Sequence, residues 1–240
     1  MKNNLTILST KILKPYIKNQ LLDNDFNVVE HDFIKLINID APEAKNVIST
    51  HLRNYIFTSK NGVKSFVEYL EKNKITLNKK SNFFSLSGET QIALEHEGYK
   101  VNVSRDNAQS LANEIISTSK ETSFIFFCGD KRRDELLDAL QHAGLQLTEI
   151  VLYKNILQPI KVSVKYEAVL FFSPSAVQSF FEENTLAKTV QCFCIGYTTA
   201  NALKEYKLNN KVTVISYPSQ QVMIDEVLHY FNIKNLIIKE

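Results

Sequence analysis

The sequence predicts an α/β protein with two similar domains, each a parallel β-sheet flanked by helices. Three observations predict this fold, and the first two are that strand-like and helical segments alternate along the whole chain and that one part of the chain repeats another. The third is the character of the strands, which are short apolar runs such as SFIFF (123–127) and AVLFF (168–172). Runs of this kind suit sheets that are buried on both faces. At 240 residues, the chain is long enough for two domains with a core each.

In the first half, five strands are expected, each followed by a helix. The helix at 61–72 shows the reasoning: Val63, Phe66 and Leu70 lie at the spacing of one helix face. Pro42 is well placed to open the next short helix, because proline is favoured in a first helical turn. The expected strands are 5–10, 27–36, 54–59, 82–87 and 100–104. The expected helices are one that ends near residue 22 and those at 42–50, 61–72, 89–97 and 107–118.

The second half continues the alternation. A strand at 123–129 precedes a helix read over DKRRDELLDALQHAG (130–144), where Gly144 is the stop signal. The segment 145–159 is extended and rich in apolar and β-branched residues. The remaining expected strands are 166–173, 191–196 and 211–216, and the remaining helices are 175–184, 198–206 and 219–232.

An internal repeat of domain size supports the two-domain interpretation. LFFSPSAVQSF (170–180) repeats IFTSKNGVKSF (56–66), so that Ser173 corresponds to Ser59. In the same order, GYTTANAL (196–203) repeats SGETQIAL (87–94), and VTVISYPSQQV (212–222) repeats VNVSRDNAQSL (101–111).

A further similarity between two segments indicates that one of the domains is discontinuous. Residues 5–33 and 123–153 share the order strand, polar turn, amphipathic helix, strand. We therefore expect a discontinuous domain 1 formed by 1–33 and 160–240, with domain 2 (36–150) inserted into it. Two linker strands, near 31–39 and 148–159, would form a two-stranded β connection between the domains.

Composition excludes several classes of protein. The net charge of +2 is too small for a protein that depends on nucleic acid, and no apolar run has the length of a membrane span. The start MKNNLTILST lacks the apolar core of a secretory signal, so a cytoplasmic protein is expected. The three cysteines lie in apolar strands and the five histidines show no ligand spacing, which argues against a metal site.

Polar residues gather where strands end and helices begin. Thr58, Ser59, Lys60 and Asn61 form one such join, and the repeat places hydroxyls at another. These residues could cap the helix, because side-chain oxygens satisfy its first amide protons. They could also bind an anion, which the same amides and the helix dipole favour. The basic run 131–133 follows a strand as well; cations at a helix start oppose the dipole and hint at an anionic ligand.

Four stretches together resemble the uroporphyrinogen-III synthase family: IFTSKNGVKSF, FCGDKRRDELLDALQHAGLQLTEIVLYKN, AVLFFSPSAVQSFF and CIGYTTANALKEYKL. The resemblance covers nearly the whole chain. It implies two α/β domains joined by a β ladder, an active site in the cleft between them, and neither a metal nor an organic cofactor. It also implies the substrate hydroxymethylbilane, a linear tetrapyrrole, and the product uroporphyrinogen III, formed with inversion of ring D and loss of water.

The resemblance assigns roles to individual residues. It implies that Tyr153 is the weak acid that assists departure of the substrate's hydroxyl; a structural reading, with its ring packed on the linker, stays open. The residues expected to bind substrate are Thr10, Lys11, Thr58, Ser59, Lys60, Asn61, Thr90, Gly129, Arg132, Ser173, Ser175, Gly196, Thr198 and Thr199.

The chain departs from the family pattern at three places. Lys11 replaces the usual arginine after the first strand and so lacks a two-pronged contact with a carboxylate. Ser87 stands where a glycine opens the turn before Thr90, and Arg132 and Arg133 compete for one arginine position.

Two other functions stay open on the sequence. A two-lobed α/β protein that binds a small anionic ligand without catalysis would show the same duplicated domains. The hypothesis of a nucleotide-binding regulatory enzyme has less support, because neither of the nucleotide-binding motifs GxGxxG and GxxxxGK[ST] occurs. With the family reading we expect a monomer with hydroxymethylbilane as its partner, a transient contact with the preceding pathway enzyme, and no nucleic acid or membrane.

Overall fold

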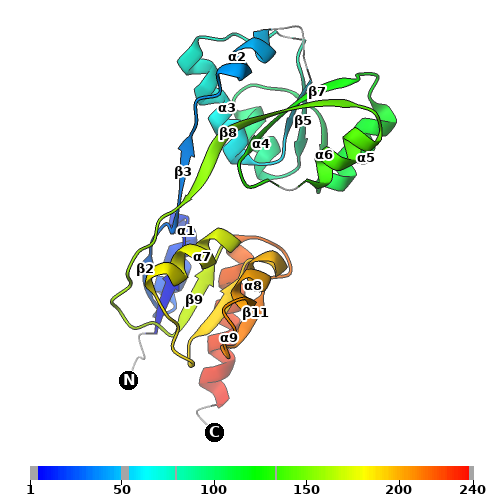
Figure 1. Cartoon of the computed structure of the whole chain (residues 1–240). Helices are drawn as coiled ribbons and strands as arrows, with labels where there is room; N and C mark the ends of the chain where they lie inside the picture. Colours follow the sequence, from blue (N-terminus) through cyan, green and yellow to red (C-terminus); the bar gives the residue numbers. More distant parts are fainter. Residues whose placement is uncertain (1–4, 50–53, 79, 133, 238–240) are drawn as a thin grey trace. The chain divides into compact units, whose positions relative to one another are not determined.

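The computed structural model describes residues 5–49, 54–78, 80–132 and 134–237. The chain divides into two compact units, which we call unit 1 (Met1–Lys35 and Ile156–Glu240) and unit 2 (Leu36–Asn155). The colours of Figure 1 follow this division: blue and yellow-to-red segments build unit 1, and blue-cyan to green segments build unit 2.

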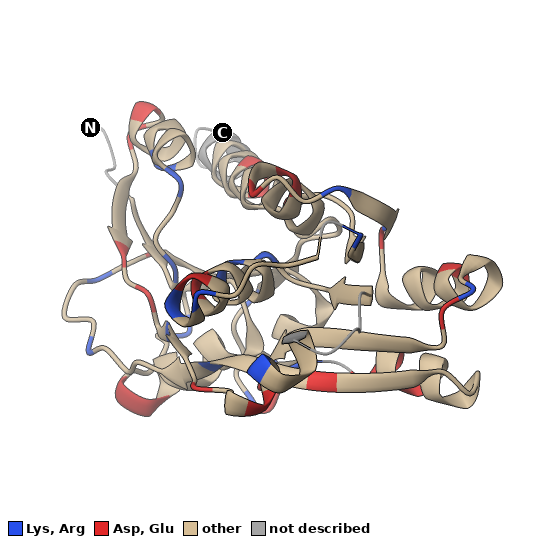
Figure 2. Ribbon diagram, turned by 90° about the horizontal axis from the view of Figure 1, so that it is seen from above, with Lys and Arg blue, Asp and Glu red and all other residues tan. Residues whose placement is uncertain are grey.

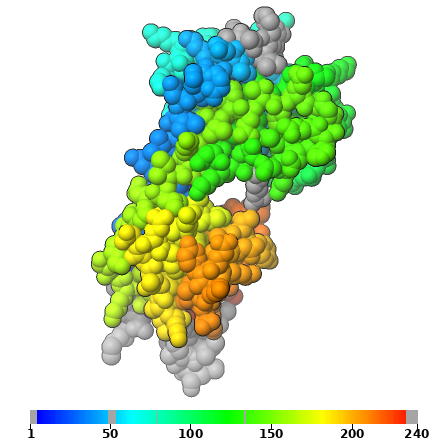
Figure 3. All heavy atoms as spheres, in the orientation of Figure 1, coloured from blue at the N-terminus to red at the C-terminus, as the bar shows by residue number. Residues whose placement is uncertain are grey.

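Unit 1 is a five-stranded parallel sheet in the order β11-β10-β9-β1-β2. Helices α1 and α9 share one apolar cluster with the sheet, and α7 and α8 share another, so the sheet is covered on both faces. The yellow and orange segments pack closely in the space-filling view (Figure 3). The strands are β1 (Thr6–Ser9), β2 (Asn27–Glu30), β9 (Ala168–Phe171), β10 (Gln191–Cys194) and β11 (Val212–Val214), and the helices are α1 (Pro15–Asp23), α7 (Pro174–Glu183), α8 (Tyr197–Lys204) and α9 (Gln220–Ile237).

Unit 2 is a six-stranded sheet in the order β3-β8-β7-β4-β5-β6, and the five strands from β8 to β6 are parallel. Helices α2, α3 and α4 pack in one apolar cluster, and α5 and α6 pack in the other. The strands are β3 (Ile34–Asn38), β4 (Asn54–Phe57), β5 (Asn82–Leu86), β6 (Val101–Arg105), β7 (Ser123–Gly129) and β8 (Gln146–Leu157), and the helices are α2 (Pro42–Ser49), α3 (Lys60–Asn73), α4 (Glu89–His96), α5 (Ala108–Thr118) and α6 (Glu135–His142).

The two sheets have matching strand orders. Unit 1 reads β2-β1-β9-β10-β11 and unit 2 reads β8-β7-β4-β5-β6, so β1 and β2 correspond to β7 and β8. In unit 1 this pair comes first along the chain, and in unit 2 it comes last. The predicted α/β fold with parallel sheets flanked by helices is confirmed, and the second copy is a circular permutation of the first.

Three expected elements differ from the structure. The extended segment 27–36 is two strands, β2 and β3, which belong to different sheets because the chain changes partners around the buried Phe33. Helix α6 begins at Glu135 rather than at Asp130, after the basic run. The last helix extends to Ile237, beyond the expected end at 232.

Charge is distributed evenly along both units. Figure 2 shows Lys and Arg interspersed with Asp and Glu over the ribbon, in keeping with the net charge of +2. Among the described residues, no helix has the length and apolar character needed to cross a membrane.

Candidate functional site

The expected site residues lie at one edge of each sheet. Parallel strands end at a common carboxyl edge, where the turns into the following helices gather and where ligands of α/β proteins bind. In unit 2 these turns follow β4, β5 and β7; in unit 1 they follow β1, β9 and β10. Only Tyr153 departs from this pattern, because it lies inside the long strand β8.

Tyr153 and Ser59 form the central contact of unit 2. Although they are 94 residues apart in sequence, their side-chain oxygens lie 2.9 Å apart. Ser59 is the N-cap of α3, and its hydroxyl oxygen accepts the Gly62 amide proton at 3.0 Å. The serine therefore caps the helix and at the same time contacts the phenol of Tyr153.

Gly129 leaves room for the tyrosine ring. It is the last residue of β7 and the register partner of Tyr153 in β8. A Cβ atom added at Gly129 would lie 2.5 Å from two ring carbons of Tyr153, closer than real contacts allow. The absence of a side chain at Gly129 thus allows the ring to lie across the end of β7.

The surroundings keep the Tyr153 phenol protonated. Burial raises its pKa above the ordinary 10.0, the hydrogen bond with Ser59 lowers it in part, and nearby Cys128 and Asp130 raise it. Burial is the largest of these effects, because an apolar environment disfavours the phenolate. At neutral pH the group is therefore a neutral hydrogen-bond donor.

Five of the expected site residues line one cavity of about 370 Å³ in unit 2: Thr58, Ser59, Gly129, Arg132 and Tyr153. The sequence interpretation missed Asp106 and Asn107, which also line it. Asn107 is the N-cap of α5, and its side chain accepts the Ser110 amide proton at 2.8 Å. An Asn directly before a helical pattern is a capping signal, so Asn107 could have been found from the sequence.

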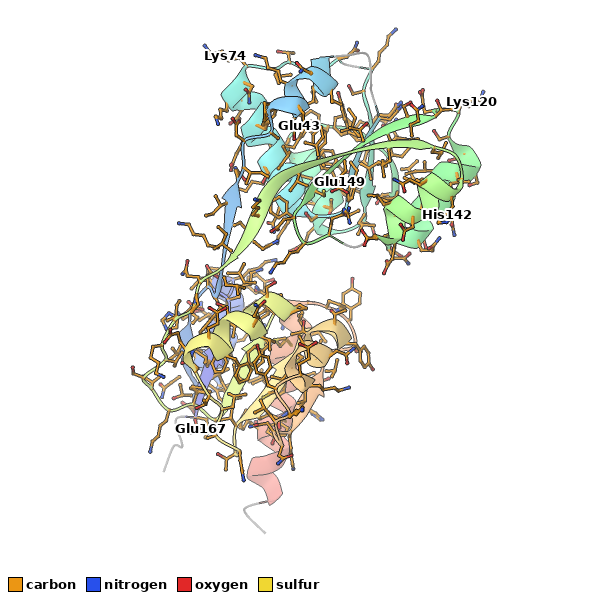
Figure 4. All side chains as sticks on the ribbon, viewed as in Figure 1. Glu43, Lys74, Lys120, His142, Glu149 and Glu167 are labelled. Carbon is orange, nitrogen blue, oxygen red and sulfur yellow. The ribbon has the colours of Figure 1, made fainter. Side chains whose placement is uncertain are left out.

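The basic side chains of this edge are paired with acids. Lys60 forms an ion pair with Glu89 at 2.8 Å. Arg132 binds Glu149, which Figure 4 labels on β8, and Asp134. The first turn of α6 is acidic, so the basic run precedes the helix and respects the dipole preference. For the run 131–133, the argument for an anionic ligand from cations at a helix start is therefore wrong, whereas Lys60 is the first residue of α3. Arg133 lies outside the described residues.

The site residues expected in unit 1 differ in their structural roles and in their exposure to solvent. Ser173 caps α7 by accepting the Ala176 amide proton at 3.1 Å, as Ser59 does in α3, so the capping prediction is confirmed for both. Thr10 is buried and donates its hydroxyl to the Leu170 carbonyl at 2.7 Å. Thr199 is buried as well. Ser175 and Gly196 are half-buried, and Lys11 and Thr198 are exposed; in unit 2, Asn61 is half-buried.

Comparison with known proteins identifies the family. Residues 15–223 match the family model described as uroporphyrinogen-III synthase HemD. The chain belongs to the uroporphyrinogen-III synthase family. Members of this family are hydro-lyases of tetrapyrrole biosynthesis that act on a small-molecule tetrapyrrole.

Two solved structures show the same fold as this family member. Uroporphyrinogen-III synthetase from Helicobacter pylori is 19% identical with a TM-score of 0.69, over 94% of this chain and 99% of that one. A mutant uroporphyrinogen III synthase from the extremely thermophilic bacterium Thermus thermophilus is 16% identical with a TM-score of 0.65, over 98% and 100%. A search of curated proteins gave no match.

One departure from the uroporphyrinogen-III synthase pattern has a structural explanation. The glycine that opens the turn before Thr90 is displaced by one residue, to Gly88, where it is the N-cap of α4 with φ at 74°. This left-handed conformation favours glycine. Thr90 itself is buried.

Metal ligands and thiols are two further kinds of group that could carry chemistry in this family member. Within the described ranges, no group of three or more His, Cys, Asp or Glu residues could hold a metal ion. The thiols of Cys128, Cys192 and Cys194 are buried, and burial raises the pKa of each from 9.0 to about 12. They therefore stay protonated and unreactive at neutral pH.

Proposed function

We propose that this chain cyclises hydroxymethylbilane to uroporphyrinogen III, with inversion of ring D and loss of water, as a step of haem and porphyrin biosynthesis. The match of residues 15–223 to the uroporphyrinogen-III synthase family carries the proposal. The contact between Tyr153 and Ser59 at the unit 2 cavity supplies a reaction-capable group in the part of the fold where ligands bind.

The carboxyl-edge turns would hold the substrate. Hydroxymethylbilane carries eight carboxylates, and backbone amides at helix N-termini attract such groups without full positive charges. In this proposal the residues of the turns bind the carboxylates through backbone amides and exposed hydroxyls. Buried Thr10, Thr90 and Thr199 would act by shaping the turns, because their side chains are withdrawn from the surface.

Tyr153 would act as the weak acid of the first step. The hydroxyl of ring A leaves as water when it takes the phenolic proton, and ring A becomes an azafulvenium cation. The substituted carbon of ring D attacks this cation to give a spiro intermediate, which fragments and recloses. The proton released from the final pyrrole restores the phenol, so the protein is unchanged at the end.

Ser59 would stabilise the tyrosine after proton transfer. Its oxygen already accepts the Gly62 amide proton, which leaves its own hydroxyl proton available for the Tyr153 oxygen. A serine that donates to the phenolate favours the ionised form and opposes the effect of burial. The remaining task is to fold the bilane so that inversion is faster than direct closure, which is a matter of positioning.

Isomer analysis tests the proposal. Freshly prepared hydroxymethylbilane is incubated with the protein, the product is oxidised, and the type I and type III isomers are separated by chromatography. We expect mainly type III with the protein and type I without it. A non-catalytic anion-binding protein would leave the type I yield of the control unchanged, and that result would overturn the proposal.

We further propose that the protein works as a cytoplasmic monomer and contacts the enzyme that makes the bilane. Buried free thiols suit a reducing compartment. The bilane closes spontaneously, so direct delivery from the preceding enzyme would protect it. Sedimentation of the protein alone and mixed with that enzyme tests the monomeric state and the contact.

A further inference from the structure

Three exposed tyrosines lie along one edge of the sheet in unit 1. Tyr16, Tyr197 and Tyr217 are 56%, 74% and 71% exposed, and no other Phe or Tyr of the described residues is exposed by more than half. None of the three rings contacts another aromatic ring within the part of the chain that the structure describes. Large flat side chains left in water at one location indicate a surface that something covers.

All three lie at the carboxyl edge of the five-stranded sheet. Tyr16 follows β1 in the first turn of α1, Tyr197 is the first residue of α8, and Tyr217 lies between β11 and α9. β10 and β11 are neighbours, which brings the turns that hold Tyr197 and Tyr217 together. The Lys14 amide donates to the Gln220 side chain at 3.2 Å, which ties the start of α1 to the start of α9.

The corresponding positions of unit 2 hold acidic residues or glycine in place of the tyrosines. In the matched segments 5–33 and 123–153, Glu135 takes the position of Tyr16, because each directly precedes a buried helical residue: Leu136 in one segment and Ile17 in the other. In the sequence repeat, Tyr197 corresponds to Gly88, and Glu89 follows it as the first residue of α4. In the sequence repeat, Asp106 takes the position of Tyr217. The two copies thus place different chemistry in equivalent turns, although their strand orders agree.

We propose that Tyr16, Tyr197 and Tyr217 bind the pyrrole rings of the linear tetrapyrrole by contact with their faces. This inference rests on the proposed function and adds the residues that recognise the rings, as distinct from those that recognise the carboxylates. Flat electron-rich rings pack on aromatic side chains in offset or edge-to-face geometry.

The arrangement around Tyr197 matches the shape of a substituted pyrrole. Each such ring of the bilane carries two carboxylate side chains. Tyr197 stands at the first position of α8, whose N-terminus has no side-chain cap. A ring on the tyrosine would therefore place a carboxylate next to backbone amides that no side chain occupies.

The test compares ring removal with hydroxyl removal. One triple variant changes all three tyrosines to serine, and the other changes them to phenylalanine. Val164→Ser is the matched control, because Val164 is 50% exposed and lies before β9, at the opposite edge of the sheet. For each protein we measure KM and kcat with hydroxymethylbilane, the type III fraction and the thermal midpoint.

We expect the serine triple variant to raise KM about tenfold or more, since each aromatic contact contributes about twofold to tenfold in affinity. Its type III fraction should fall, while the phenylalanine variant and Val164→Ser stay within about twofold of the unchanged protein. An unchanged KM in the serine variant overturns the inference, as does an equal loss in the phenylalanine variant or in the control. Failure of the unchanged protein to make type III would instead overturn the proposed function, so the two failures are distinguishable.

Discussion

Tyr153 is the residue whose surroundings are most closely adapted to chemistry. Its ring lies across Gly129, its hydroxyl meets Ser59, and it is only 7% exposed. Because burial raises its pKa above 10.0, the acid form is present at every pH near neutrality. Activity that depends on this proton should therefore fall only as the pH rises through that raised value.

Tyr153→Phe separates the catalytic role from the structural one. We expect turnover to fall about a hundredfold, the lower end of general-acid contributions, because the hydroxyl of the bilane departs readily. Loss of one hydrogen bond should lower the free energy of unfolding by only about 1 kcal/mol. Turnover and thermal midpoint are measured on one preparation. Full turnover with a lowered midpoint would mean that the phenol has only a structural role.

Gly129→Ala tests how the ring is held. The added methyl group would overlap the ring of Tyr153, so we expect a loss of about 1–3 kcal/mol in stability and lower turnover. In a Tyr153→Leu background the same substitution should cost less, because the ring that it strikes is gone. Urea unfolding of the four proteins measures this difference; equal costs in both backgrounds would contradict the account of Gly129.

At the scale of elements, capping serines start equivalent helices in the two copies. Ser59 opens α3 and Ser173 opens α7, each after a buried parallel strand. The cap satisfies an amide of the first turn and fixes where the helix begins. Ser59, unlike Ser173, contacts Tyr153, and the proposed mechanism gives it a role in the reaction as well as in the cap.

Ser59→Ala should therefore have two effects. Loss of the cap should lower stability by about 1 kcal/mol, as should Asn107→Ala, which removes the cap of α5. Only Ser59→Ala should also raise the pKa of Tyr153 further, seen by ultraviolet titration of the phenol, because the bond that favours the phenolate is lost. Ser59→Thr keeps a hydroxyl, so it should retain the stability and the Tyr153 pKa of the parent protein. Equal tyrosine titrations in Ser59→Ala and the parent protein would exclude this role.

At the scale of the whole molecule, each unit has its own core. The four apolar clusters formed by described residues draw either on unit 1 or on unit 2. A unit with a two-faced core of this kind can fold by itself.

A fragment of residues 36–155 should accordingly fold alone. We expect a cooperative urea transition and a free energy of unfolding of about 5 kcal/mol or more, typical of a small domain. Unit 1 can be made contiguous by a short linker, because the Gln158 amide donates to the Phe33 carbonyl at 2.9 Å and so holds its two segments together. Absence of a cooperative transition in both proteins would show that neither unit is stable without the other.

Alkaline pH should weaken the whole molecule through its buried thiols. Their pKa is raised from 9.0 to about 12 in the folded protein, so the unfolded chain ionises first. Stability from this source is complete below pH 9 and is lost as the pH rises toward 12. At pH 8 a thiol reagent should modify the three cysteines only after denaturation. Rapid modification of the native protein would contradict their burial.

The sequence by itself determined the features that depend on near neighbours. Apolar spacing set the face of α3, and the polar residue before each helix set the caps at Ser59 and Ser173. The repeat and the buried apolar strands were sufficient for the fold class, and the ordered motifs were sufficient for the family. These features can be recognised from the sequence because each depends on residues that lie a few positions apart.

Only the tertiary structure decided which distant residues meet. Parallel pairing of β7 with β8 places Tyr153 over Gly129 and beside Ser59, and it gives Arg132 its partner Glu149. The tertiary structure also decided that the segment 27–36 is divided between two sheets. Strand pairing joins segments that are far apart in the chain, and local spacing carries no record of which strand lies next to which. Chemistry that depends on two strands therefore appears only when the sheet is assembled.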